Sequence, residues 1–179
     1  MPFLGRPLIL RILERLASIT DEVILSTNRL AEYAFLGLPL HPDLLPDCGA
    51  LGGLYTSINA ARGSIIAAVA CDMPFANPAL FEYEYGLLSA TGADVVIPST
   101  SQGLEPLHAV YRKETCLPVL RSALESGRLK LVGWLPQVDV RIVLPEEMTR
   151  FDPHNLAFLN LNTPEEFRQA EEQARLLEN

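Results

Sequence analysis

Short apolar runs alternate with amphipathic helical patterns along the chain, and this alternation constrains the fold more than any other feature of the sequence. Ile65 to Ala70 is an uninterrupted apolar run, which is typical of a parallel strand covered on both faces. Helical patterns flank it, over Pro7 to Ser18 before it and Pro78 to about Ala90 after it. Strands that alternate with helices predict an α/β fold with a mainly parallel sheet.

Further strands and helices are expected on both sides of this central unit. Apolar runs predict strands over Val23–Leu25, Gly37–His41, Asp94–Ile97, Ala109–Tyr111, Val140–Leu144 and Phe158–Asn162. Helical patterns cover Leu30–Phe35, Leu54–Arg62 and Glu114–Ser126, and a capping box at Thr163-Pro164-Glu165-Glu166 opens a last helix. We expect Pro98 to end its strand and the glycines of residues 49–53 to form a loop that leads into a helix.

Length and composition exclude several classes of protein. The 179 residues predict one domain, spanning 1–179, because domains commonly have ~100 to 200 residues. A hydrophobic fraction of 49% argues against disorder, and no apolar run approaches the ~18 to 20 residues that a membrane span requires. The N-terminus lacks the pattern of a secretory signal, so we expect a cytoplasmic protein.

Cysteine and charge content narrow the function further. Cys48, Cys71 and Cys116 are odd in number and contain no CxxC pair, which argues against a disulfide framework and a zinc site. The formal net charge is −8, and Lys113 and Lys130 are the only lysines, which argues against a nucleic-acid surface. An anionic ligand would therefore require a metal ion or a local site to offset the repulsion.

Polar residues follow the predicted strands, where ligands bind in parallel α/β sheets. Asp72 ends the most apolar strand and is followed by Met73 and Pro74. A carboxylate in this position is suited to hold Mg²⁺ between nucleotide phosphates, although an aspartate that caps a helix or serves a turn has the same pattern.

Three further groups are candidates for ligand binding. Gly49 to Gly53 would let backbone N–H groups approach an anion or would simply permit a tight turn, and no Walker A lysine follows. Ser26 and Asn28 are placed to donate to a base or ribose, or to satisfy their own loop. Asn160 and Asn162 lie two residues apart, which suits a shared ligand or a cap before the helix.

Other types of catalytic site find no support in the sequence. The three histidines, His41, His108 and His154, are scattered without the spacing of metal ligands, and a structural role fits His108 better. No combination of serine or cysteine with histidine and aspartate indicates covalent catalysis.

Four motifs in order along the chain resemble the molybdenum cofactor guanylyltransferase family. They are Gly49-Ala50-Leu51-Gly52-Gly53, Cys71-Asp72-Met73-Pro74, Glu105-Pro106-Leu107-His108-Ala109-Val110-Tyr111 and Asn160-Leu161-Asn162-Thr163-Pro164-Glu165-Glu166. The resemblance implies a three-layer Rossmann-like nucleotidyltransferase fold. It also implies an Mg²⁺-dependent enzyme that transfers GMP from GTP to the terminal phosphate of molybdopterin and releases pyrophosphate.

The resemblance also implies roles for individual residues. Asp72 corresponds to the catalytic aspartate that binds Mg²⁺ and the nucleotide. Ser26, Asn28, Asp43 and Gly52 are implied on the nucleotide side. Glu105, Pro106, Asn160 and Asn162 are implied on the side of the acceptor substrate. Joining two anions depends on positioning and charge neutralisation, which an acidic chain achieves only with a metal.

One departure from the family's pattern is large. Members begin with a strand and a loop of the form L-A-G-G-x-S-x-R-M-G-x-D-K, whereas Met1-Pro2-Phe3-Leu4-Gly5-Arg6-Pro7 resembles the stretch after that lysine. We therefore expect a sheet that lacks its first strand and has unpaired edges, and inefficient catalysis by the chain as written. The sequence leaves open a fragment, a misplaced start or a natural variant.

Two neighbouring functions stay open beside guanylyl transfer. The first is cytidylyl transfer to molybdopterin. The second is a non-catalytic module that binds the cofactor or regulates its delivery. GTP and molybdopterin are the expected small-molecule partners, with molybdoenzymes or cofactor-delivery proteins as protein partners, and no nucleic acid or membrane is expected.

Overall fold

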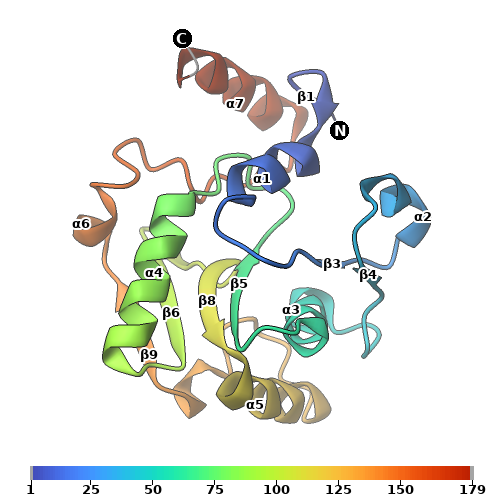
Figure 1. Ribbon diagram of the computed structural model, residues 1–179, viewed down its shortest axis with the longest axis vertical. Helices are drawn as coiled ribbons and strands as arrows, with labels where there is room; N and C mark the ends of the chain where they lie inside the picture. The colour runs from blue at the N-terminus through green and yellow to red at the C-terminus, as the bar shows by residue number, and fades with distance from the viewer. Residues whose placement is uncertain (1, 178–179) are drawn as a thin grey trace.

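A computed structural model describes residues 2–177 of the chain as an α/β protein (Figure 1). The helices are α1 (Leu8–Leu16), α2 (Leu30–Tyr33), α3 (Gly49–Ala60), α4 (Pro78–Thr91), α5 (Lys113–Glu125), α6 (Pro145–Met148) and α7 (Pro164–Leu177), with 3-10 turns at Ala34–Leu36 and Leu135–Gln137. The strands are β1 (Pro2–Phe3), β2 (Arg6–Pro7), β3 (Leu25–Ser26), β4 (Leu40–His41), β5 (Ile65–Val69), β6 (Val95–Thr100), β7 (Gly103–Leu104), β8 (His108–Arg112) and β9 (Val140–Val143).

The main sheet has the strand order β5-β8-β6-β9, and the short β7 forms a hairpin with the end of β6. β8 runs antiparallel to both β5 and β6, whereas β9 is parallel to β6. β5, β6 and β9 therefore share one direction, and their carboxyl ends meet at one edge of the sheet. This edge is where ligands bind in α/β sheets.

Helices cover both faces of the main sheet. On one face, α3 and α5 pack with Val95, Ile97 and Tyr111 around the fully buried Trp134. On the other face, α4 packs against Val96, Val110 and Val143. A third apolar cluster joins β1, α1 and α7 and includes Phe3, Phe75 and Leu161, at the top of the view in Figure 1. The segment after β5 lies between this cluster and the sheet.

β5 has an unpaired outer edge. In the antiparallel ladder with β8, the Lys113 N–H donates to the Ser64 carbonyl and the Ala70 N–H to the Leu107 carbonyl, so even-numbered residues bond toward β8. The backbone groups of Ile65, Ala67 and Val69 face away from β8. β3 and β4 form a separate two-stranded parallel sheet, and no strand of residues 2–177 pairs with β5 on its outer side. The open edge expected from the sequence is confirmed.

Several local predictions were wrong. Ile65–Ala70 is not a parallel strand covered on both faces: it pairs antiparallel with β8, and Ala67 is exposed at the sheet edge. Residues 158–162 form no strand: Phe158 and Leu161, which are three residues apart and would face opposite sides of a strand, are both buried. β6 continues through Pro98 because the proline pairs in register with Val143 of β9.

The local sequence signals that predicted helix ends agree better with the structure than the strand predictions do. The Thr163–Glu166 capping box forms in both directions, with the Glu166 N–H donating to Thr163 Oγ1 and the Thr163 N–H to Glu166 Oε2. The cysteines are free, as expected. Within residues 2–177, no helix combines the length and the apolar character needed to cross a membrane.

Candidate functional site

Asp72 lies just beyond the carboxyl end of β5, as the sequence predicted. The side chain is half-buried, and its Oδ1 atom is buried without a hydrogen-bond partner among the described residues. Burial raises the pKa of the Asp72 carboxyl. A buried carboxylate oxygen that the protein leaves unbonded is suited to accept a cation.

The donor set around Asp72 fits Mg²⁺ better than a metal held by the protein alone. Residues 2–177 contain no group of three or more histidine, cysteine or acidic side chains arranged to hold an ion. Mg²⁺ in nucleotide sites commonly takes one or two carboxylates and completes its shell with water and substrate phosphates. A single carboxylate with an unbonded oxygen meets that requirement.

The turn that follows Asp72 is fixed by the N-terminal helix. From α1, Arg11 Nε donates to the Pro74 carbonyl at 3.2 Å, and Arg15 Nε donates to the Ala76 carbonyl at 2.8 Å. These arginines satisfy backbone carbonyls in a segment without regular structure. α1 therefore positions the loop that carries Asp72.

The segment that holds Asn160 and Asn162 lies directly beside Asp72. The Leu161 N–H donates to the Asp72 carbonyl at 3.0 Å, and Leu161 is buried. Asn160 is half-buried and its amide donates to the Phe158 carbonyl, whereas Asn162 is exposed. Two motifs that lie 88 residues apart in the sequence thus meet at one point of the structure.

The buried side chains of His108 and Glu84 lie next to each other, and His108 contacts the end of the same loop. The Asn77 N–H, which follows this loop, donates to His108 Nε2 at 3.2 Å. His108 Nδ1 lies 3.4 Å from Glu84 Oε1 without the geometry of a hydrogen bond, and both side chains are fully buried. His108 also stacks on Phe81, with ring centroids 3.9 Å apart. His108 is structural, in agreement with the sequence analysis.

Burial makes both groups of this pair neutral. It raises the pKa of Glu84 well above its usual value and lowers the pKa of His108 to about 3. Because Nε2 accepts from Asn77, the neutral imidazole carries its proton on Nδ1, which faces Glu84. The sequence analysis did not identify Glu84, because a glutamate in a helix ordinarily indicates an exposed position.

Ser26, Asn28 and Asp43 form a second cluster, next to β3 and β4. Asp43 accepts from Ser26 Oγ at 3.3 Å and from Asn28 Nδ2 at 3.0 Å, and its own N–H donates to Asn28 Oδ1. A Cβ at Gly53 would lie 3.8 Å from Ser26 Oγ and 3.9 Å from Asp43 Oδ1, so α3 borders this cluster closely. The sequence predicted these residues separately, and the structure brings them together.

Gly52 has a different environment from the one that was predicted. The stretch 49–53 is the first part of α3 rather than a loop, and the Gly52 N–H donates to the Cys48 carbonyl within that helix. A Cβ at Gly52 would lie 2.9 Å from the Cβ of Cys48. The glycine is therefore required for close packing, and its role toward a nucleotide stays a prediction.

Glu105 and Pro106 form a turn at the same edge of the sheet as Asp72. Glu105 accepts a hydrogen bond from Thr100 Oγ1 at 2.9 Å, and the Pro106 carbonyl accepts from the Tyr111 hydroxyl at 2.6 Å. The Glu105 carbonyl accepts from the N–H of His108, which begins β8. Since β8 lies between β5 and β6, this turn stands between the end of β5 and the end of β6.

The arrangement as a whole places polar groups in a row along the carboxyl edge. The Ser26–Asn28–Asp43 cluster lies on the β3–β4 side, Asp72 follows β5, and the Glu105 turn comes next (Figure 1). A carboxylate with an unbonded oxygen, placed between two polar clusters, is suited to hold a cation that brings two phosphorylated molecules together.

Comparisons with known proteins are consistent with this geometry. The family described as "MobA-like NTP transferase domain" matches residues 1–138. A molybdenum cofactor guanylyltransferase from Desulfosudis oleivorans is 30% identical over 167 residues, which are 93% of this chain and 82% of the relative.

Solved structures show the same fold. Molybdopterin-guanine dinucleotide biosynthesis protein A from Archaeoglobus fulgidus superposes with a TM-score of 0.84 at 24% identity, over 98% of this chain and 89% of that one. A 2-C-methyl-D-erythritol 4-phosphate cytidylyltransferase from Thermus thermophilus gives a TM-score of 0.67 at 16% identity, over 96% and 90%. The second protein is named as a cytidylyltransferase that acts on a different acceptor, so the same fold occurs in enzymes named for different nucleotides and acceptors.

Proposed function

The chain belongs to the family of MobA-like NTP transferases, and we propose that it transfers GMP from GTP to the terminal phosphate of molybdopterin. The observation that carries the proposal is the buried Asp72 oxygen that has no hydrogen-bond partner within residues 2–177, at the carboxyl end of β5 and directly beside residues 160–162. The name of this relative supports the choice of GMP and molybdopterin, and the geometry supports the roles that we propose for the residues.

In the proposed reaction, a phosphate oxygen of the acceptor attacks the α-phosphorus of GTP. A new P–O bond forms, the bond to the β-phosphate breaks, and pyrophosphate leaves with its electron pair. The Asp72 carboxylate would hold Mg²⁺, which supplies neutralisation of the phosphate charges. A chain with a net charge of −8 offers little other compensation.

The protein's own groups orient the two substrates on either side of Asp72. Ser26, Asn28 and Asp43 are proposed to contact the ribose or base of the nucleotide. Asn160, Asn162 and the Glu105 turn are proposed to contact the acceptor. Asp72 is held by the Leu161 N–H and by a turn that α1 fixes, so little reorganisation is needed when the substrates bind.

The test is nucleotide binding measured by calorimetry. GTP is titrated into the purified chain with and without Mg²⁺, and ATP and CTP are titrated in parallel to establish base preference. We expect Mg²⁺-dependent binding that prefers GTP. Asp72→Ala should weaken it by roughly tenfold to a hundredfold, as loss of groups that support a metal site commonly does.

Asp21→Ala is the matched control, because Asp21 is an exposed aspartate outside the site. Binding that is equal for wild type and Asp72→Ala would contradict the role of this carboxylate. A preference for CTP would instead indicate cytidylyl transfer. A folded chain that binds no nucleotide would reject catalysis by this chain and favour a module that only binds the acceptor.

A further inference from the structure

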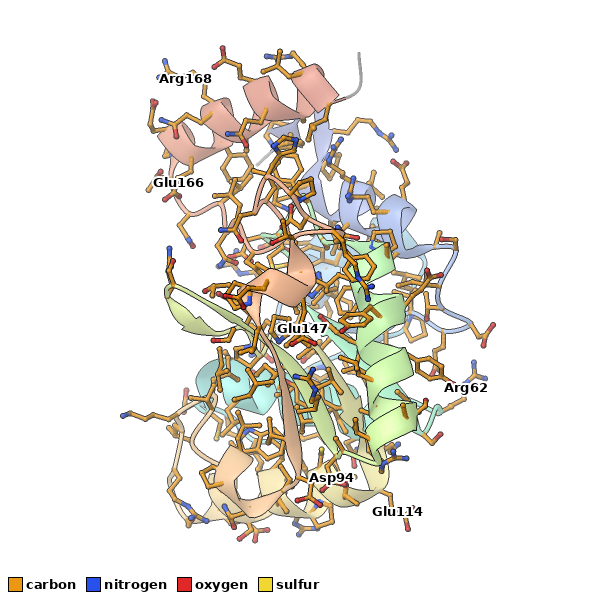
Figure 2. All side chains as sticks on the ribbon, turned by 90° about the vertical axis from the view of Figure 1, so that its left-hand side faces the viewer. Arg62, Asp94, Glu114, Glu147, Glu166 and Arg168 are labelled. Atoms are coloured by element: carbon orange, nitrogen blue, oxygen red, sulfur yellow. The ribbon has the colours of Figure 1, made fainter. Side chains whose placement is uncertain are left out.

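A cavity of 420 Å³ lies at the carboxyl ends of β6 and β9, and of its lining residues only Thr100, which donates to Glu105, has been described so far. Its lining includes Thr100, Ser101, Met148, Thr149, Asp152 and Asn155. Figure 2 looks onto this side of the molecule, where α6, with Glu147 labelled, lies beside the hairpin of β6 and β7. The lining combines hydroxyl, carboxylate and amide groups with the apolar side chain of a methionine.

The walls of the cavity are held by contacts with the rest of the fold. On α6, Glu147 accepts from the Tyr83 hydroxyl at 2.9 Å and forms an ion pair with Arg141 at 2.5 Å, which fixes α6 to α4 and β9. Asn77 Nδ2 donates to the Phe151 carbonyl at 2.9 Å, which fixes the neighbouring loop. Since Asn77 also follows the Asp72 turn, one residue connects the cavity wall to the metal-binding loop.

The cavity and Asp72 lie on the same edge of the sheet. β5, β6 and β9 share one direction, and β8 separates β5 from β6. With about 4.8 Å between neighbouring strands, the end of β6 lies about 10 Å and the end of β9 about 14 Å from the end of β5. A molecule that reaches from Asp72 into the cavity must therefore be an extended one, such as a fused ring system that carries a phosphate ester.

Asp152 gives the cavity a specific recognition group. Its Oδ1 accepts from the Leu156 N–H at 2.9 Å, and its Oδ2 accepts from the Ala157 N–H at 2.7 Å. These bonds fix the plane of the carboxylate, and each oxygen retains a further lone pair. Two adjacent N–H donors on a flat heterocycle match two fixed carboxylate oxygens, and such paired, charge-assisted bonds are strong.

We propose that this cavity binds the pterin ring of the acceptor, with Asp152 accepting hydrogen bonds from the 2-amino-4-oxopyrimidine edge. The inference rests on the proposed function, because it assigns the acceptor's end of that site. Met148, Ser101 and Asn155 also line the cavity and would offer an apolar side chain, a hydroxyl and an amide to the rest of the ring.

Guanine carries the same 2-amino-4-oxopyrimidine edge, so the position of the cavity decides between the two rings. The Ser26–Asn28–Asp43 cluster lies on the opposite side of Asp72, beyond β5, next to β3 and β4 (Figure 1). A nucleotide bound there leaves the β6–β9 end for the second substrate. The cavity therefore belongs to the pterin.

The experiment measures binding of 6-hydroxymethylpterin, followed by its own fluorescence. Asp152→Asn replaces one acceptor oxygen with an N–H₂ group, and Ser101→Phe places a large ring at the exposed mouth of the cavity. We expect each variant to weaken pterin binding by roughly tenfold to a hundredfold, as expected for lost hydrogen bonds to a charged group or a blocked pocket. Ser122→Phe, at an exposed position on α5, is the matched control and should bind like wild type.

The Asp152 carboxylate also accepts hydrogen bonds from the N–H groups of Leu156 and Ala157, so Asp152→Asn can disturb folding of this loop. Ser101→Phe leaves these bonds in place and keeps the test valid if the first variant folds poorly. Wild-type chain that binds no pterin, or Ser101→Phe that binds it as wild type does, overturns the assignment. If Ser101→Phe weakens GMP binding and leaves pterin binding unchanged, the cavity holds guanine and the assignment is wrong. Pterin binding without any Mg²⁺-dependent GTP binding would reject the proposed function and still support the cavity assignment.

Discussion

Replacing Glu84 with glutamine should change how the stability of the protein depends on pH. In the folded chain the fully buried carboxyl keeps its proton, because burial raises its pKa well above the usual 4.5. In the unfolded chain the same carboxyl releases its proton above about pH 4.5. Over the interval between these two pKa values, the unfolded state binds one proton fewer, so the contribution of Glu84 to stability falls as pH rises.

His108 has the opposite dependence. Its pKa falls from 6.5 to about 3 on folding, so between these values the unfolded chain binds a proton that the folded chain does not. Stability from this group is lost as pH falls below 6.5 and restored as pH rises toward it. Where the two pH intervals overlap, above about pH 4.5 and below about pH 6.5, the two dependences oppose each other.

Glu84→Gln keeps the shape of the side chain and removes the titratable carboxyl proton. The free energy of unfolding of the variant, minus that of wild type, should therefore increase with pH by up to about 1.4 kcal/mol per pH unit. The difference accumulates from about pH 4.5 up to the pKa of Glu84 in the folded chain, and any constant cost of the amide changes only the offset.

The assay is urea unfolding at pH 5, 6, 7 and 8, followed by circular dichroism. Glu82→Gln, an exposed glutamate on the same helix, measures the effect of the same chemical change at the surface and is subtracted. A stability difference between Glu84→Gln and wild type that stays constant from pH 5 to pH 8 would refute a carboxyl that is neutral in the folded chain.

Three further substitutions test packing and capping by the same unfolding assay. Gly52→Ala should destabilise the protein by about 1 to 3 kcal/mol, because its Cβ would lie 2.9 Å from the Cβ of Cys48. Gly86→Ala, in the middle of α4 with open space around it, should instead stabilise by about 0.5 to 1 kcal/mol, and equal signs for the two glycines would contradict the packing argument. Thr163→Ala should cost about 1 kcal/mol through the lost cap of α7, and an unchanged midpoint would show that the capping box with Glu166 contributes nothing.

The helices could be predicted from the sequence because their signals are local. Pro7 precedes α1, Asn77 caps α4 with Pro78 at its first position, and Gly127 follows α5. Each signal depends on residues within one turn of the helix end. The same reasoning failed for the start of α3, since a run of glycines ordinarily indicates a loop, and the sequence does not show that Gly52 packs against the side chain of Cys48 within a helix.

The pairing of strands could not be predicted, because it depends on partners that are distant in the sequence. The apolar run of β5 shows that its side chains favour burial, and it does not show that β8 approaches from the opposite direction. The alternation over residues 158–162 indicated a half-exposed strand, in which Phe158 and Leu161 would face opposite sides, whereas both are buried. A strand additionally requires a neighbouring strand, and the Leu161 N–H bonds instead to the Asp72 carbonyl.

Some residues of the candidate site could likewise be predicted from the sequence, and others could not. Asp72 was identifiable because a carboxylate directly follows an apolar strand. The Asp152 cavity was not, because it is assembled from the end of β6, from α6 and from the loop after it, and none of these carries a sequence pattern of its own. Glu84 was also not identifiable, since only the contact with His108 distinguishes it from a surface glutamate.

The open edge of β5 divides the backbone amides of one short strand into two sets. The N–H groups that bond toward β8, at residues 66, 68 and 70, are covered by the sheet, whereas those of Ile65, Ala67 and Val69 face the unpaired side. Hydrogen exchange follows the opening of each bond rather than the average stability of the strand. Deuterium should therefore enter β5 with a period of two residues, fast at odd positions and slow at even ones, and binding of any extended segment along this edge would be registered as loss of that alternation.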